Sequence, residues 1–228
     1  MISDLLRFPR FYRYPYYHWG KAFSSLLSEA DVADDATIID APCGDGVVTF
    51  WLAKNGFRNS FVLCDIAERD VNRARKLKDW PALRNVEVKV TLADIHDLKV
   101  TCERTRDVWF LINSLFLLPE IDRLFEKMRP RVEHVIGLFP DISSRNYRCY
   151  KKRHPTMNAN EMDRNEVSAF FNRHGYETKK TLDASFIPHH CIQPMRLQQI
   201  ARYGLNPFGN LVSKKDPCYW VGLFSRID

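Results

Sequence analysis

Short β-branched and apolar runs alternate with helix-like segments along most of the chain, and this alternation restricts the fold more than any other feature. The runs that we expect to be strands are residues 36–41, 60–65, 86–94, 106–114, 134–140, 178–187 and 218–227. Segments with helical spacing of apolar residues are 21–30, 47–56, 66–80, 120–128 and 164–177. Strands that alternate with helices in this way predict an α/β domain, with helices on both faces of a largely parallel sheet.

The chain is long enough for one large core but too short for two comfortable domains, since it has 228 residues, of which 45% are hydrophobic. We therefore expect a single domain over residues 1–228. Three parts stand outside the alternating pattern: an N-terminal aromatic lid or helix (1–30), a basic insertion (142–160) and a C-terminal insertion (188–214).

The composition indicates the cellular environment of the protein, the state of its cysteines and the charge of its possible partners. No apolar stretch approaches the ~20 residues that span a bilayer, and the N-terminus lacks a signal-peptide pattern, so we expect a soluble, cytoplasmic protein. The six cysteines show no paired C-x-x-C spacing, which favours free thiols and predicts no metal site. The formal charge of +6 permits an anionic partner without requiring one.

Polar side chains stand at the ends of the first five predicted strands. In parallel sheets the carboxyl ends of the strands meet at one edge, where ligands bind. The residues that this rule brings to that edge are Asp40, Asp65, Asp94, Asn113 and Asp141.

The loop after the first strand reads "IIDAPCGDG" (38–46) and combines two glycines with two acids. Asp40 and Asp45 would repel a diphosphate, and no Lys-Ser/Thr pair follows Gly46, which excludes a nucleoside triphosphatase loop. Acids in this place suit a ligand with an ammonium group, and Asp65 at the end of the next strand suits the hydroxyls of a ribose. S-adenosylmethionine meets both requirements.

The chain resembles the class I S-adenosylmethionine-dependent methyltransferases. "IIDAPCGDG" is similar to their first motif, "FVLCDIAERDVNRAR" to the second, "LADIHDL" to the third and "DVWFLINSLFLLPEIDRLFEKM" to the fourth. The resemblance implies a Rossmann-like, doubly wound, seven-stranded sheet, mostly parallel with an antiparallel C-terminal strand. Two departures from the family pattern are Pro42, in place of the first loop glycine, and "MRPRVEH", in place of a glycine pair before the fifth strand.

The resemblance also implies roles for individual residues in binding S-adenosylmethionine. Gly44 and Gly46 would approach the methionine part, Asp65 the ribose and Asp94 the adenine amine. Ile66 would pack on the adenine, and Asn113 would present backbone near the sulfonium. The full set of expected cofactor residues is Asp40, Ala41, Pro42, Cys43, Gly44, Gly46, Asp65, Ile66, Asp94, Ile95, Asn113 and Tyr17.

Histidine is the natural base for a hydroxyl or amine acceptor near neutral pH. His189 and His190 follow the sixth predicted strand and are our first candidates, with His18 as an alternative. Asp141 would orient a base or bind the acceptor. The aromatic segment 11–19 predicts either a lid, with Tyr14, Tyr17 and Trp19 shielding the sulfonium, or a cap over exposed apolar surface.

These observations predict a methyltransferase that acts on an O or N atom of a small molecule or glycan, including an anionic one because of the basic run 145–154. The alternatives are an RNA- or protein-modifying methyltransferase and a non-catalytic adaptor with the same fold. The acceptor and the oligomeric state stay open.

Overall fold

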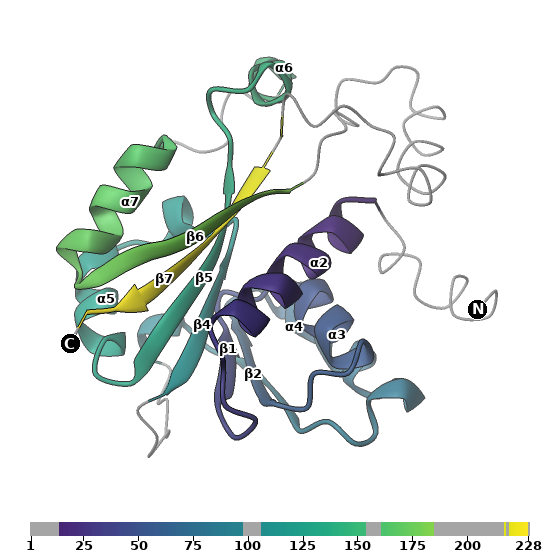
Figure 1. Ribbon diagram of the computed structural model, residues 1–228. Coiled ribbons are helices and arrows are strands. Elements are labelled where there is room, and N and C mark those ends of the chain that lie inside the picture. The colour runs from purple at the N-terminus through teal and green to yellow at the C-terminus, as the bar shows by residue number, and fades with distance from the viewer. Residues whose placement is uncertain (1–13, 98–105, 154–160, 185–216, 218, 228) are drawn as a thin grey trace.

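Seven strands form one mixed sheet in the computed structural model, which describes residues 14–97, 106–153, 161–184, 217 and 219–227 (Figure 1). The strands are β1 (Thr37–Asp40), β2 (Ser60–Asp65), β3 (Val88–Leu92), β4 (Asp107–Ile112), β5 (Val132–Pro140), β6 (Tyr176–Ala184) and β7 (Tyr219–Arg226). Their order is β3-β2-β1-β4-β5-β7-β6, and only β7 runs antiparallel to its neighbours. The predicted doubly wound α/β fold with an antiparallel last strand is confirmed.

Helices cover both faces of this sheet. They are α2 (Tyr14–Glu29), α3 (Val47–Lys54), α4 (Glu68–Lys78), α5 (Ile121–Met128), α6 (Arg145–Arg153) and α7 (Arg164–Arg173), with short 3₁₀ turns η2 (Pro81–Leu83), η3 (Ile95–Asp97) and η4 (Leu115–Leu117). Helices α2, α3 and α4 lie on one face, and α5 and α7 lie on the other (Figure 1).

The core is divided by the sheet into two buried clusters. Side chains alternate along a strand, so Ile38 joins the cluster under α2 and α3, while its neighbour Ile39 joins the cluster under α5 and α7. Trp109 and Phe110 of β4 divide in the same way. This explains why the central strand is almost wholly apolar.

The structure adds to the prediction at three places along the chain. Helix α2 begins at Tyr14 rather than at residue 21, so the second half of the aromatic segment is helical. The predicted basic insertion contains helix α6, which lies at the carboxyl edge of the sheet (Figure 1). The turn before β5 forms without a glycine pair, with the Arg131 N–H donating to the Met128 carbonyl at 3.0 Å. The insertion 188–214 lies outside the described residues.

None of the helices that the structure describes has the length and apolar character needed to cross a bilayer.

Candidate active site

Asp40 ends β1 as a fully buried carboxyl group. Burial, together with the negative charge of Asp65, raises its pKa from about 3.8 to about 8, although the hydroxyl of Thr49 donates to Oδ2 at 2.6 Å and opposes the shift. The other oxygen, Oδ1, has no hydrogen-bond partner among the described residues. One side of Asp40 is therefore held by the protein, and the other side is open to a donor.

The loop after Asp40 brings its backbone close to β2. The Ala41–Pro42 peptide is cis, which the sequence did not indicate, and the Cys43 N–H donates to the Cys64 carbonyl at 2.8 Å. Gly44 and Gly46 have φ of +54° and +66°, a region that favours glycine. A Cβ on Gly46 would lie 2.4 Å from the Leu63 side chain, whereas Gly44 has open space beside it. Gly46 therefore allows close packing, and Gly44 leaves room for a ligand.

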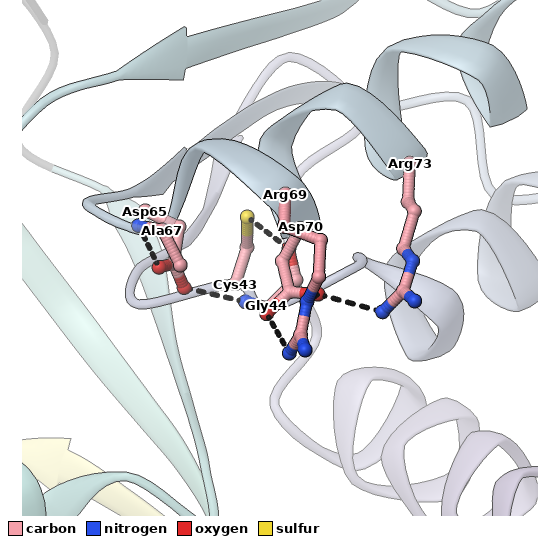
Figure 2. A network of polar contacts seen from close by, with 7 residues as sticks. All are labelled: Cys43, Gly44, Asp65, Ala67, Arg69, Asp70 and Arg73. Atoms are coloured by element: carbon pink, nitrogen blue, oxygen red, sulfur yellow. Dashed lines mark hydrogen bonds and ion pairs between the residues drawn. The ribbon is translucent and has the colours of Figure 1, made fainter.

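Asp65 connects this loop to the start of α4 (Figure 2). Its Oδ2 accepts the Gly44 N–H at 2.7 Å and its Oδ1 accepts the Ala67 N–H at 2.8 Å. Figure 2 also shows Asp70 in the first turn of α4 paired with Arg69 and Arg73, and these cations lower the pKa of Asp70. The glycine loop and the end of β2 thus form one polar unit.

An apolar side chain stands next to this unit. Ile66 follows Asp65 directly and is 68% exposed, which is unusual for a large aliphatic residue. Its position makes it available to a flat apolar ligand group.

The ends of β3 and β4 complete the same edge of the sheet. Asp94 accepts the His96 N–H at 2.8 Å and directly precedes η3, in which Ile95 is buried. Asn113, directly after β4, has φ of +54° and donates its N–H to Leu138 at 2.9 Å. Its side-chain oxygen is buried without a partner among the described residues. Since β3, β2, β1 and β4 are successive neighbours, Asp94, Asp65, Asp40 and Asn113 stand along one edge in that order.

The candidate catalytic residues have different surroundings. Asp141 follows β5, accepts the Ser143 hydroxyl at 2.6 Å and pairs with Arg164 at 2.6 Å; Arg164 also reaches Asp183 at 2.5 Å. This carboxylate is therefore engaged on both oxygens. His18 lies on α2, and His189 and His190 lie outside the part of the chain that the structure describes.

The aromatic residues of α2 pack on neighbouring elements. Trp19 meets Tyr219 of β7 edge-on at 5.2 Å between ring centroids, and Tyr17 meets Trp51 of α3 at 6.1 Å. These contacts support the cap alternative for Trp19. The side chain of Tyr14 lies outside the described set.

Sequence reasoning missed Thr49, Arg164 and Trp220. Arg164 and Trp220, together with Asp141, Ser143, Asp163 and Asn165, line a pocket of about 300 Å³ at the end of β5. The one signal available was the D-x-x-E pattern of Asp163 and Glu166, a capping box that places the start of α7 at Arg164.

Comparison with known proteins gives the fold and the family. A family model described as "Methyltransferase domain" matches residues 33–163, which is more than half of the chain. No curated protein sequence matches.

Several solved structures share the fold. The magnesium protoporphyrin IX methyltransferase of Synechocystis PCC 6803, with bound SAH, is 17% identical, with 92% of this chain and 83% of that chain covered and a TM-score of 0.60. An S-adenosylmethionine-dependent methyltransferase of Aquifex aeolicus is 14% identical over 99% and 93%, with a TM-score of 0.59. A putative sarcosine dimethylglycine methyltransferase of Galdieria sulphuraria is 14% identical over 92% and 85%, with a TM-score of 0.60.

The acceptors named for these structures range from a porphyrin to small amino acids, so the shared fold does not identify an acceptor. The family model, the strand order and the glycine loop after β1 agree with one another. This chain belongs to the class I S-adenosylmethionine-dependent methyltransferases.

Proposed function

We propose that the protein transfers the methyl group of S-adenosylmethionine to an O or N atom of a small molecule or a glycan. The observation that supports the binding mode is the pair of buried oxygens without partners, Asp40 Oδ1 and Asn113 Oδ1, at the ends of neighbouring strands. A buried polar atom without a hydrogen bond costs ~1–3 kcal/mol. The ammonium group of the cofactor would offset this cost by donating to both sites, directly or through water.

The remaining residues fit the other parts of the cofactor. The open space beside Gly44 would receive the methionine part, and Asp65, at the end of β2, would bind the ribose hydroxyls. The exposed Ile66 offers an apolar surface for the adenine ring, with Asp94 at the adjoining strand end. The bound cofactor supplies an electrophilic methyl group on a sulfonium. The protein's contribution is to hold that group in line with the acceptor and to keep water away.

The acceptor proposal is supported by the pocket of about 300 Å³ beside β5, which has the size of one small ring or a few functional groups. A hydroxyl acceptor must lose its proton as its oxygen bonds to the methyl carbon and the sulfur–carbon bond breaks. We propose His189 or His190 as the base, with His18 as the alternative; Asp141, already paired with Arg164, would orient or bind the acceptor.

Calorimetric titration with S-adenosylhomocysteine tests the cofactor part. Asp65→Asn keeps the shape of the side chain but removes the charge and one of the two accepted hydrogen bonds, so we expect binding to weaken about 10- to 100-fold. Asp34→Asn is the matched control, because Asp34 is an exposed acid before β1 and should bind like the wild type. Equal affinity of Asp65→Asn and wild type, or no binding by the wild type, would contradict the proposal.

A second candidate is methylation of RNA or of a protein, and the positive charge of α6 favours RNA. Arg148 and Lys152 are exposed on this helix at the carboxyl edge of the sheet. RNA binding through such residues must fall steeply as the salt concentration rises. Anisotropy of labelled single-stranded RNA at increasing salt distinguishes the two candidates.

A further inference from the structure

The pocket beside β5 lies apart from the cofactor residues but at the same edge of the sheet. Its walls come from the turn after β5, the start of α7 and Trp220 of β7. β7 is two strands away from β4, which places Trp220 about 10 Å to the side of Asn113. In the proposed function, a group bound in the pocket would therefore lie beside the end of β4, where Asn113 is assigned to the sulfonium.

The charges around the pocket disfavour an anion. Arg164 is the only cation among the pocket residues that the structure describes, and it is already paired with Asp141 and Asp183. Asp163 adds a third carboxylate, whose Oδ1 caps α7 by accepting the N–H groups of Asn165 and Glu166. The first-turn N–H groups that would attract an anion are therefore in use.

Among the described residues, several hydrogen-bonding groups of the pocket-lining side chains have no partner. Trp220 is fully buried, and its indole N–H has no acceptor among the described residues. Arg164 packs over the Trp220 ring at 5.5 Å and uses only Nη2 in its ion pairs with Asp141 and Asp183. The Asn165 side chain adds an amide donor and an amide acceptor.

This combination of spare donors and acceptors, with no surplus positive charge, fits neutral hydroxyl groups, each of which both donates and accepts. Resting on the proposed function, we propose that the pocket binds a neutral, polyhydroxylated ring of the acceptor, such as a sugar residue. One hydroxyl oxygen accepts from Trp220, and neighbouring hydroxyls bind Asn165 and the carboxylates. The pocket is then an anchoring subsite, and the methylated atom lies toward β4.

Nuclear magnetic resonance of the indole N–H groups tests this proposal on the full chain, which has five tryptophans. We expect a neutral methyl pyranoside to shift the Trp220 signal, assigned by Trp220→Phe, with a dissociation constant of about 1–10 mM. Asn165→Ala, which keeps the backbone cap of α7, should weaken this binding about 3- to 10-fold. The same titration with glucuronate and with glucosamine shows whether an anionic or a cationic sugar binds more tightly than the neutral one.

Trp109 is an internal control, because its indole N–H donates to the Ala41 carbonyl of the cofactor loop at 2.7 Å. S-adenosylhomocysteine should shift the Trp109 signal, and the pyranoside should leave it in place. No Trp220 shift with the pyranoside, or tighter binding of glucuronate or glucosamine, would overturn the proposal. Failure of S-adenosylhomocysteine to bind would count against the proposed function instead.

Discussion

At the scale of single residues, Asp40 has the environment that matters most for binding a cation. It is fully buried, holds a hydrogen bond from Thr49 and has one oxygen without a partner. With a pKa of about 8 it is mostly neutral at pH 7 in the free protein. An ammonium group beside Asp40 would favour ionisation of its carboxyl group. Asp40 is therefore mostly neutral without a ligand and would become a carboxylate when a cation binds.

The raised pKa predicts a pH-dependent stability that Asp40→Asn removes. Between about pH 4 and pH 8 the folded protein holds a proton on Asp40 that the unfolded chain has lost, so this group makes folding less favourable as pH rises. The slope is at most about 1.4 kcal/mol per pH unit. Asparagine does not titrate and can still accept from Thr49. The stability of Asp40→Asn relative to wild type should therefore rise from pH 5 to pH 8 in urea unfolding.

Thr49→Val is the companion variant for this experiment. It removes the hydrogen bond that lowers the pKa of Asp40, so the pH dependence should extend above pH 8. A stability difference between Asp40→Asn and wild type that stays constant from pH 5 to pH 8 would contradict the prediction.

At the scale of elements, the crossing of α2 over α3 depends on Gly20. A Cβ on this residue would lie 2.4 Å from Cδ2 of Trp51, in the body of the indole rather than at a flexible tip. The close approach brings the aromatic turn of α2 onto α3, where Tyr17 contacts Trp51. The position of the aromatic segment is therefore a consequence of helix packing.

This packing predicts whether Gly20→Ala raises or lowers the free energy of unfolding. In a helix interior, alanine is normally more favourable than glycine by about 1 kcal/mol. Overpacking against Trp51 costs about 1–3 kcal/mol and outweighs this gain, so Gly20→Ala should lower the free energy of unfolding by up to about 2 kcal/mol. In a Trp51→Leu background the same change should become neutral or stabilising. Ser25→Ala, on the exposed side of α2, is the control. A stabilising Gly20→Ala in the wild-type background would show that the helices separate readily.

At the scale of the whole molecule, the sequence predicted the sheet and its edge because those features have local signals. Strands β1 and β2 are largely apolar runs that end in Asp40 and Asp65, and the apolar strand β4 is followed directly by Asn113. The link between Arg164, Asp141 and Asp183 has no such signal, since its members come from three separate elements. Helix α2 was predicted too short because Pro15 and a run of aromatic residues resemble a loop, and its helix forms through contacts with α3 and β7.

The same view divides the proposed site into two parts. The strands β3, β2, β1 and β4 end next to the residues proposed for the cofactor, whereas β5 and β6 end, and the antiparallel β7 begins, around the pocket. Helix α6, which carries basic residues, follows β5 at the carboxyl edge of the sheet (Figure 1). Whether those charges bind a polymer decides between the two candidate functions.

The distribution of charge argues against a polymer and gives the last prediction. Several basic side chains are already paired with carboxylates: Lys151 of α6 pairs with Glu161, and Arg69 and Arg73 of α4 pair with Asp70. We expect the dissociation constant for single-stranded RNA to exceed about 100 µM at physiological salt.

The variant Arg148→Ala/Lys152→Ala removes two exposed charges from α6, and Lys76→Ala/Lys78→Ala removes two from the last turn of α4. For a small-molecule or glycan enzyme, anisotropy measurements should show the same weak RNA binding for both variants. For an RNA enzyme, the plot of the logarithm of the binding constant against the logarithm of the salt concentration should instead become less steep by about 1.4 in the α6 variant alone, because two phosphate contacts would be lost. That selective loss would favour RNA as the acceptor and would contradict the proposal of a small-molecule or glycan acceptor.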